Sequence, residues 1–351
     1  SLSLGGQSVL AAKPWSKLPQ AWLDNMSCLN IATGANAHPE FNAVLGFSGA
    51  VKGIDGTGSE YFPSLIAQET AASLGTLMPE PVIVGGKTYA SAGTKLGLLQ
   101  PLDIKELFAE SKAYTNELNR LRDRALDDIY RDTKHNGTRA QRNFIDQYSQ
   151  SRTQAKQIGE SLNALITDID GNDPLNQVNM AVALFRLNLT PLVSIGLVTG
   201  GDNHQDDLLE RETSETINTI NILRSFHQAL VDANLEDRVN FANLYTFGRQ
   251  HKRNNNGGRN HHRNHHSMYL YGSNIQAGII GDLELTYKRG AVDDLQSVAF
   301  NASTGQAANA DISRDESLAA AGKTIARSVG ISDERINLRI SGGKVITAAI
   351  S

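Results

Sequence analysis

The sequence predicts an α/β protein in which a central, mostly parallel sheet lies between helices. In the second half of the chain, apolar runs typical of strands alternate with long helical segments. A strand–helix–strand order makes successive strands parallel, joined by crossovers. Apolar residues make up 40% of the 351 residues, which is enough to form a sizeable core.

The N-terminal part of the chain predicts three short elements of this body. Residues 1–6 alternate between polar and apolar side chains and end in a glycine pair, which predicts a short strand and a tight turn. Residues 64–74 predict a helix that ends at Gly75, and residues 81–85 predict a buried strand.

Residues 101–173 predict a different structure, a long helical hairpin. Apolar residues recur there at spacings of three and four, and charged or amide side chains occupy most positions between them. The polar stretch 135–138 separates the two helices. We therefore expect an antiparallel helical pair inserted into an α/β body formed by residues 1–100 and 174–351, with its apolar seam packed as core.

The second half predicts alternating helices and strands. The expected helices cover residues 174–187, 208–234 and 317–329, and the expected strands cover residues 192–198, 239–245, 267–271 and 283–287. Binding sites in parallel sheets form in the loops after the C-terminal ends of strands. Two polar loops follow expected strands, residues 199–207 and residues 250–266.

Composition excludes several classes of protein. No apolar run approaches the roughly 20 residues needed to cross a bilayer, and the mean hydropathy is −0.31, so we expect no membrane span. The net charge of −4 argues against a nucleic-acid partner. Cys28 is the only cysteine, which excludes an internal disulfide, a cysteine-based zinc site and an iron–sulfur cluster. The chain begins at Ser1 without Met, as expected either after processing on export or in a shortened chain.

Histidines are concentrated in the second polar loop. Five of the nine histidines lie within residues 251–266. Neutral imidazole is the commonest metal ligand, and loops that follow parallel strands can bring several imidazoles together. A solvated polar loop is the alternative, since asparagine, glycine and arginine fill most of the remaining positions.

The first polar loop strengthens the metal hypothesis. Residues 200–204 read Gly-Gly-Asp-Asn-His and follow an expected buried strand. An Asp-x-His pair in this position can direct a carboxylate and an imidazole toward one point, and the glycines allow close approach of the backbone. A helix-capping aspartate beside an incidental histidine is the alternative. Together the two loops favour a metal site that is either present or ancestral.

Several short motifs occur along the chain in a fixed order. They are Gly-Gly at 5–6, Lys-Pro at 13–14, Ala-His-Pro-Glu at 37–40, Gly-Gly-Asp-Asn-His at 200–204, Phe-Gly-Arg at 247–249, Gly-Arg-Asn-His-His at 258–262 and Gly-Ile-Ile-Gly at 278–281. This order resembles the bacterial "domain of unknown function 1501" family, which is related to alkaline phosphatases and sulfatases.

The resemblance implies an alkaline-phosphatase-like fold with metal-binding loops at one edge of the sheet. It also implies export to the periplasm or the cell exterior, because members of the family typically carry a twin-arginine signal. Three positions depart from the family's acidic residues, namely Gln7, Thr246 and Asn260. Since two-metal sites need several anionic ligands, these losses favour one metal ion over two.

The reduced ligand set that the resemblance implies is Asp202, His204, His261 and His262. A zinc ion fits this set best, with calcium or manganese as alternatives, or the site is degenerate and holds no metal.

The first functional hypothesis is a metal-dependent hydrolase that acts on phosphate or sulfate esters of a small molecule or polymer. Arg249 or Arg259 would hold the anionic group through paired hydrogen bonds. Ser8 or Thr246 would be the nucleophile, because each comes just after an expected strand.

The alternative hypothesis is a non-catalytic structural, assembly or binding protein built on the same fold. The lost acidic residues favour it, and the helical hairpin could form the interface of a homo-oligomer. A third reading gives the basic tract 251–266 a role in polyanion binding, but no aromatic residue interleaves within it to stack on bases.

Overall fold

A computed structural model of the chain describes residues 1–108, 113–199 and 201–351. Its largest sheet has four strands in the order β12-β3-β11-β8. These strands are β3 (Met26–Ile31), β8 (Phe241–Ala242), β11 (His266–Tyr271) and β12 (Gly278–Ile280). β12 and β3 are parallel, whereas β11 is antiparallel to both of its neighbours, β3 and β8.

The predicted fold class, an alkaline-phosphatase-like and mostly parallel central sheet, is therefore wrong. The described residues form a mixed α/β structure with small sheets, and no extended parallel sheet occurs among them. Parallel neighbours require a crossover, usually a helix, between them. Residues 243–265 connect β8 to β11 without a helix, so the chain returns antiparallel.

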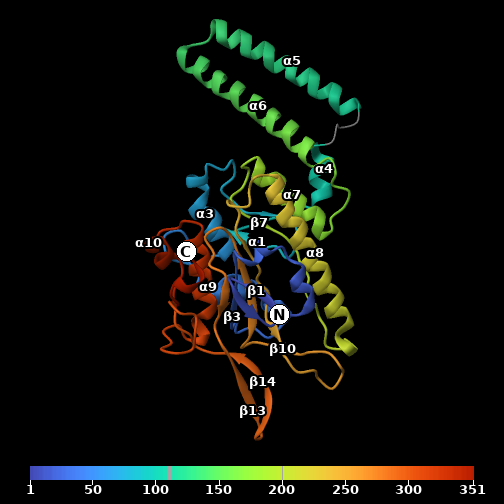
Figure 1. Cartoon of the computed structure of the whole chain (residues 1–351). Helices are drawn as coiled ribbons and strands as arrows, with labels where there is room; N and C mark the ends of the chain where they lie inside the picture. The colour runs from blue at the N-terminus through green and yellow to red at the C-terminus, as the bar shows by residue number, and fades with distance from the viewer. Residues whose placement is uncertain (109–112, 200) are drawn as a thin grey trace.

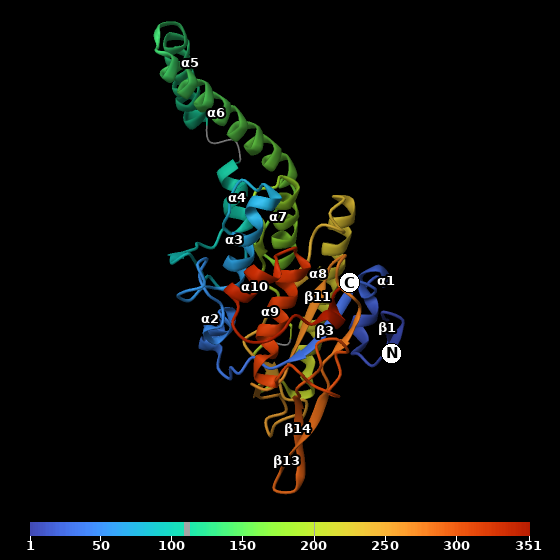
Figure 2. The same cartoon turned by 90° about the vertical axis from the view of Figure 1, so that its left-hand side faces the viewer.

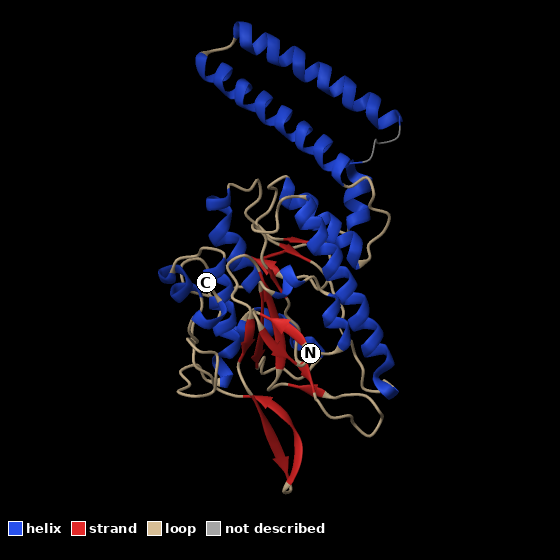
Figure 3. Cartoon of the chain, in the orientation of Figure 1, coloured by secondary structure: helices blue, strands red, loops and turns tan. Residues whose placement is uncertain are grey.

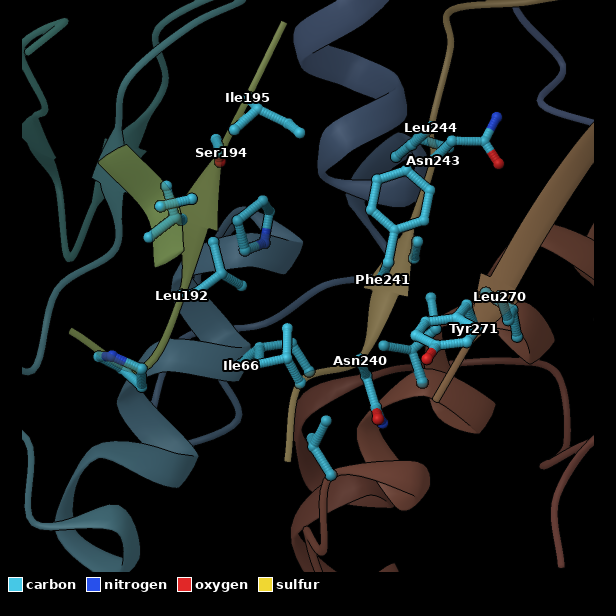
Figure 4. Close-up of a pocket in the computed structure, with 18 of the residues that line it drawn as sticks. Ile66, Leu192, Ser194, Ile195, Asn240, Phe241, Asn243, Leu244, Leu270 and Tyr271 are labelled. Atoms are coloured by element: carbon cyan, nitrogen blue, oxygen red, sulfur yellow. The ribbon is translucent and has the colours of Figure 1, made fainter. Parts of the chain in front are cut away.

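Two strands that we expected in the same sheet lie apart from it. β4 (Val82–Ile83) and β7 (Val193–Ser194) form a separate parallel pair. A cavity of about 610 Å³ is lined by residues from the segments that contain β7 and β8 (Figure 4). Apolar side chains such as Leu192, Phe241 and Leu270 surround it. β7 and β8 are therefore not joined into one sheet.

Helices cover both faces of the four-stranded sheet. On one face, α3 (Phe62–Leu74) and α9 (Ser317–Ser328) bury apolar side chains against β3, β11 and β12. On the other face, α7 (Pro174–Arg186) and α8 (Glu210–Asp232) pack around Trp22, which stacks on Tyr271 with ring centroids 3.8 Å apart. The four-stranded sheet thus lies between two apolar cores.

The predicted helical hairpin region contains three helices, α4 (Pro101–Phe108), α5 (Ala113–Asn136) and α6 (Arg139–Leu165). Figures 1 and 2 show α5 and α6 as an antiparallel pair that extends away from the rest of the molecule. Thr138 caps α6 by accepting a hydrogen bond from the amide of Gln141. The expected helix also includes residues 109–112, which lie outside the described residues.

The apolar seam of this hairpin is only partly buried. At its base, Ile158, Leu162 and Leu165 pack on the body of the molecule. Further out, Ile129 and Phe144 expose 54% and 69% of their surface. The expectation that the whole seam is core therefore holds only at the base.

Short elements complete the fold (Figure 3). The remaining helices are α1 (Gln20–Leu23), α2 (Phe41–Leu45) and α10 (Asp333–Arg339), with 3-10 turns at Lys13–Lys17, His38–Glu40, Phe47–Gly49, Asp207–Leu209, Arg314–Glu316 and Thr347–Ala349. Four antiparallel ribbons pair β1 (Leu2–Leu4) with β2 (Gln7–Val9), β5 (Ala90–Ser91) with β6 (Thr94–Lys95), β9 (Gly248–Arg249) with β10 (His261–His262), and β13 (Leu283–Lys288) with β14 (Ala291–Ser297).

Candidate metal centre

Four side chains from three separate segments gather at one place, which we name the open cluster: His38, Asp202, His204 and His261. His38 begins the 3-10 turn that follows β3, and His261 lies on β10. Asp202 and His204 come from the polar loop after β7. The two polar loops of the sequence thus meet, together with a histidine from the N-terminal third of the chain.

The atoms that could bind a metal ion lie close together in the open cluster. Ligand atoms of His38, Asp202 and His261 all fall within 4.8 Å of one another. The Nε2 atoms of His204 and His261 are 2.9 Å apart. Asp202 Oδ1 lies 3.3 Å from His204 Nε2 and 3.9 Å from His261 Nε2, and its Oδ2 lies 3.6 Å from His38 Nε2.

Hydrogen bonds fix the proton positions on two of the imidazoles. His261 Nδ1 lies 2.7 Å from the carbonyl oxygen of Asn36, which can only accept, so Nδ1 carries the proton. His204 Nδ1 lies 3.3 Å from Asn260 Oδ1 and carries its proton for the same reason. In both neutral rings the lone pair then sits on Nε2. Two lone pairs face each other across 2.9 Å, an arrangement that needs a proton or a metal ion between them.

The backbone before His38 is held by an acidic side chain. Glu40 Oε2 accepts hydrogen bonds from the amides of Asn36 and Ala37 at 2.6 and 2.7 Å. These two bonds, with a smaller contribution from the charge of Arg263, lower the pKa of the Glu40 carboxyl. The same segment provides the Asn36 carbonyl that orients His261, so Glu40 supports two ligands at once.

An arginine lies directly beside the open cluster. Arg249 Nη2 lies 3.3 Å from Asp202 Oδ1 and also donates to the carbonyl oxygen of Gly201. Its guanidinium lies 5.4 Å from the ring centroid of Phe247, which itself stacks on His261 at 3.8 Å. Arg249 is therefore held at the edge of the cluster by a carboxylate, a carbonyl and a ring.

The charges at this place favour deprotonated ligands. Partial burial raises the pKa of Asp202, but the hydrogen bond from Arg249 and the charges of His204, Arg249 and His38 outweigh it, so the pKa is lowered. Burial lowers the pKa of His261, helped by the charge of Arg249 and against the pull of its hydrogen bond to Asn36. Both groups are thus in the form that binds metal at neutral pH.

The geometry fits a small divalent cation. Nitrogen and oxygen ligands about 2.0 Å from a tetrahedral zinc ion are roughly 3.3 Å apart. The separations within the open cluster, from 2.9 to 3.9 Å, lie on either side of that value. The side chains of Asp202 and His38 are about half exposed, at 55% and 49%, so water and a ligand can reach the centre.

The structure brings together three of the four predicted ligands, Asp202, His204 and His261. It places His262 elsewhere, because successive side chains of a strand point to opposite faces. His262 follows His261 on β10, and its Nε2 lies 3.9 Å from Asp294 instead. Gly200, part of the predicted loop motif, lies outside the described residues.

The predicted catalytic residues are divided in the same way. Arg249 joins the open cluster, whereas Arg259 forms a two-pronged ion pair with Glu212 of α8. Ser8 is exposed on β2 opposite Ser3, and Thr246 is buried before Phe247. Among the described residues, no hydrogen bond or ion pair joins either hydroxyl to the open cluster.

Sequence reasoning did not assign His38 to the site. Its signal was present, since Ala37-His38-Pro39-Glu40 was one of the ordered motifs and follows β3 in the sequence. β3 itself was not predicted, so nothing placed this histidine at the end of a central strand.

Comparisons with models of known protein families, with curated proteins and with solved structures find no match to this chain. Within the described residues, no helix combines the length and the apolar character needed to cross a bilayer, as the composition predicted.

Proposed function

We propose that the open cluster binds one divalent transition metal, with zinc as the best fit. The facing Nε2 atoms of His204 and His261 carry this proposal, because two imidazoles whose Nδ1 protons are fixed present two lone pairs that a metal ion can bridge in place of a shared proton. Asp202, His261 and His38 form a trio whose ligand atoms lie within 4.8 Å of one another. Imidazoles and one carboxylate suit zinc better than the oxygen-preferring calcium ion, and three of the cluster's ligands at a time leave the fourth tetrahedral position for water.

We further propose that the centre hydrolyses phosphate or sulfate esters. A zinc ion held by protein ligands lowers the pKa of bound water to about 7. The cluster is open to solvent, and Arg249 offers a fixed positive charge to an anionic group beside Asp202. Because neither Ser8 nor Thr246 contacts the described cluster, water is the nucleophile that we favour.

The direct test compares the chain with its Asp202→Ala variant. Both proteins are purified without chelators or a histidine tag, and their metal content is measured by mass spectrometry. Hydrolysis of p-nitrophenyl phosphate and p-nitrophenyl sulfate is then measured on each. We expect the variant to lose the metal of the open cluster and the activity together.

A matched control is His135→Ala, which removes an exposed histidine at the end of α5. It should keep both the metal and the activity. A wild-type protein that binds metal but hydrolyses neither ester would end the hydrolase proposal and leave the metal proposal standing. Asp202→Ala with unchanged metal content and activity would end both.

A second candidate function, assembly of identical subunits, is favoured by the outer part of the helical hairpin. Leu121, Ile129 and Phe144 leave about half or more of their surface exposed on α5 and α6. Such a row of apolar side chains is typical of a helical interface. Sedimentation velocity would show an oligomer that Ile129→Glu combined with Phe144→Glu converts to monomers; a monomeric wild type would exclude this role.

Two further proposals rest on the motif order alone. These are membership of the "domain of unknown function 1501" family and export to the periplasm or cell exterior. Fractionation of cells that express the complete gene would test export, since a protein found only in the cytosolic fraction would contradict it.

A further inference from the structure

A second group of ionisable side chains lies on the other face of the β9–β10 ribbon. We name it the buried cluster: His251, His262, His265 and Asp294. His251 follows β9, His262 lies on β10, His265 precedes β11, and Asp294 lies on β14. It contains none of the residues of the open cluster.

The most buried members of this cluster lack partners. His265 exposes 6% of its surface, and neither of its ring nitrogens has a hydrogen-bond partner. The side chain of Asp294 exposes 1%, and its Oδ2 is also without a partner. A buried polar atom left unpaired costs about 1–3 kcal/mol. Three such atoms in one cluster make binding of a ligand there favourable.

The members of the buried cluster lie close to one another. His251 Nδ1 lies 3.7 Å from Asp294 Oδ1, and the rings of His251 and His265 have centroids 4.7 Å apart. Asp294 Oδ1 accepts the amides of His251 and Leu295, both at 2.9 Å, which fixes the carboxylate and leaves Oδ2 free. The amide of Asp294 donates to Thr286 Oγ1 on the paired strand β13, which anchors its backbone.

His262 has a different role from that of a ligand. Its Nδ1 accepts a hydrogen bond from the amide of Asn264 at 3.2 Å, so the neutral ring carries its proton on Nε2. That Nε2 faces Asp294 Oδ2 at 3.9 Å. A protonated nitrogen cannot bind a metal, but it can orient a metal-bound carboxylate or water.

We propose that the buried cluster is a second divalent-cation site, independent of the open cluster, in which His251, His265 and Asp294 are ligands and His262 positions Asp294. Two imidazoles and one carboxylate form a ligand set that zinc and other transition metals accept. A bound cation would satisfy Asp294 Oδ2 and one ring nitrogen of His265 at once.

The buried cluster is wider than the open one. Among the described residues, His38, Asp202 and His261 of the open cluster bring their ligand atoms within 4.8 Å of one another, and no three residues of the buried cluster do so. Closure on a cation therefore needs movement of one side chain. The side chain of His251 is 37% exposed in a loop and can turn, whereas Asp294 and His265 are enclosed. Binding at this site should accordingly order His251.

The test uses an Asp202→Ala protein that also carries His261→Ala, because three imidazoles would otherwise remain in the open cluster; the buried cluster stays intact. Zinc binding is measured by isothermal titration calorimetry, with metal content as a second readout. We expect one equivalent bound in this background. Adding His251→Ala, a change at an exposed position that should fold, should weaken zinc binding at least about tenfold. Adding His135→Ala instead should change nothing.

Two outcomes would overturn the proposal. One is a folded protein with Asp202→Ala and His261→Ala that binds no zinc at micromolar concentration. The other is zinc binding that His251→Ala and Asp294→Asn both leave unchanged, with folding of each variant checked by circular dichroism. Because the background lacks the open cluster, neither outcome depends on the proposed hydrolase function.

Discussion

The two histidine clusters lie on opposite faces of one short β-ribbon and differ mainly in burial. In the open cluster Asp202 is 55% exposed and paired with Arg249, so its ligands can be reached by a substrate. In the buried cluster Asp294 is 1% exposed and partly unpaired. Neighbouring residues of β10, His261 and His262, belong to different clusters because strand side chains alternate.

The difference in burial indicates which role each cluster can have. A centre that acts on an external ester needs an open coordination position and a nearby charge, and only the open cluster has both. A closed site contributes binding energy to folding instead. The same residue type, at adjacent positions of one strand, can thus support chemistry on one face and stability on the other.

The largest expected effect separates the adjacent histidines of β10. His261→Ala removes a ligand of the open cluster, so the metal there should be lost and ester hydrolysis should fall by at least about 10³-fold, given the several kcal/mol that a catalytic metal supplies. His262→Ala should keep that metal and that activity. Steady-state kinetics and metal analysis of the two variants test whether only His261→Ala loses metal and activity.

Equal losses of metal and activity in both variants would contradict the division into two clusters, since they would place both histidines in one site as the sequence alone suggested.

The next effect is a dependence of stability on pH in the metal-free protein. Burial lowers the pKa of His265 from 6.5 to about 3 and that of His266 to about 4. Below pH 6.5 the unfolded chain binds protons at these residues and the folded chain does not, so stability is lost as pH falls. Linkage gives about 2 kcal/mol for each histidine between pH 6.5 and pH 5.

Urea unfolding in the presence of a chelator measures this loss. His266→Phe should remove about half of it, while His135→Ala, at an exposed position, should leave it intact. A free energy of unfolding that stays constant from pH 7 to pH 5 would contradict the burial of these rings.

A smaller effect concerns substrate binding at the open cluster. Arg249→Gln removes the positive charge beside Asp202 and keeps the metal ligands. We expect kcat/KM for an anionic ester to fall about 10²-fold with the metal content unchanged. Hydrolysis of a neutral carboxylic ester serves as the control, because it should fall much less. Loss of the metal in this variant would show that Arg249 supports the ligands instead.

The smallest effect comes from introducing an acidic residue next to His204. Asn260 Oδ1 accepts from His204 Nδ1 at 3.3 Å, and a carboxylate there would make the imidazole a stronger ligand. Asn260→Asp should tighten zinc binding about tenfold at the open cluster, and Asn260→Ala should weaken it. Competition with a zinc-binding dye measures both. Weaker binding by the aspartate variant would contradict the assigned proton positions.

The sequence predicted the helices better than the sheet. α3, α7, α8 and α9 followed from apolar spacing and end signals, and Gly75 ends α3 in the left-handed conformation expected of it. The antiparallel direction of β11 was not predicted, although residues 243–265, which precede it, contain no helix that could form a parallel crossover. β3 was missed because Ser27 and Asn30, both buried in the structure, interrupt its apolar pattern.

The sequence predicted which loops form the site, but not which face of β10 each histidine occupies. Asp202, His204 and His261 stood out as a carboxylate and imidazoles that follow strands. The division of His261 from His262 depends on the pairing of β9 with β10, two residues each, inside a tract of asparagine, histidine and arginine that carries no strand signal. Assigning His38 to the site required knowledge of β3. Contacts between distant segments, rather than local sequence pattern, decide both the separation of His261 from His262 and the position of His38.

The most direct measurement is anomalous diffraction at the zinc edge from crystals grown with zinc. The two clusters predict two separate peaks, one between the Nε2 atoms of His204 and His261 and one beside Asp294 and His265. A single peak at the open cluster would remove the second site and keep the proposed centre. The absence of a peak between His204 and His261 would contradict the central claim that this place is a metal centre.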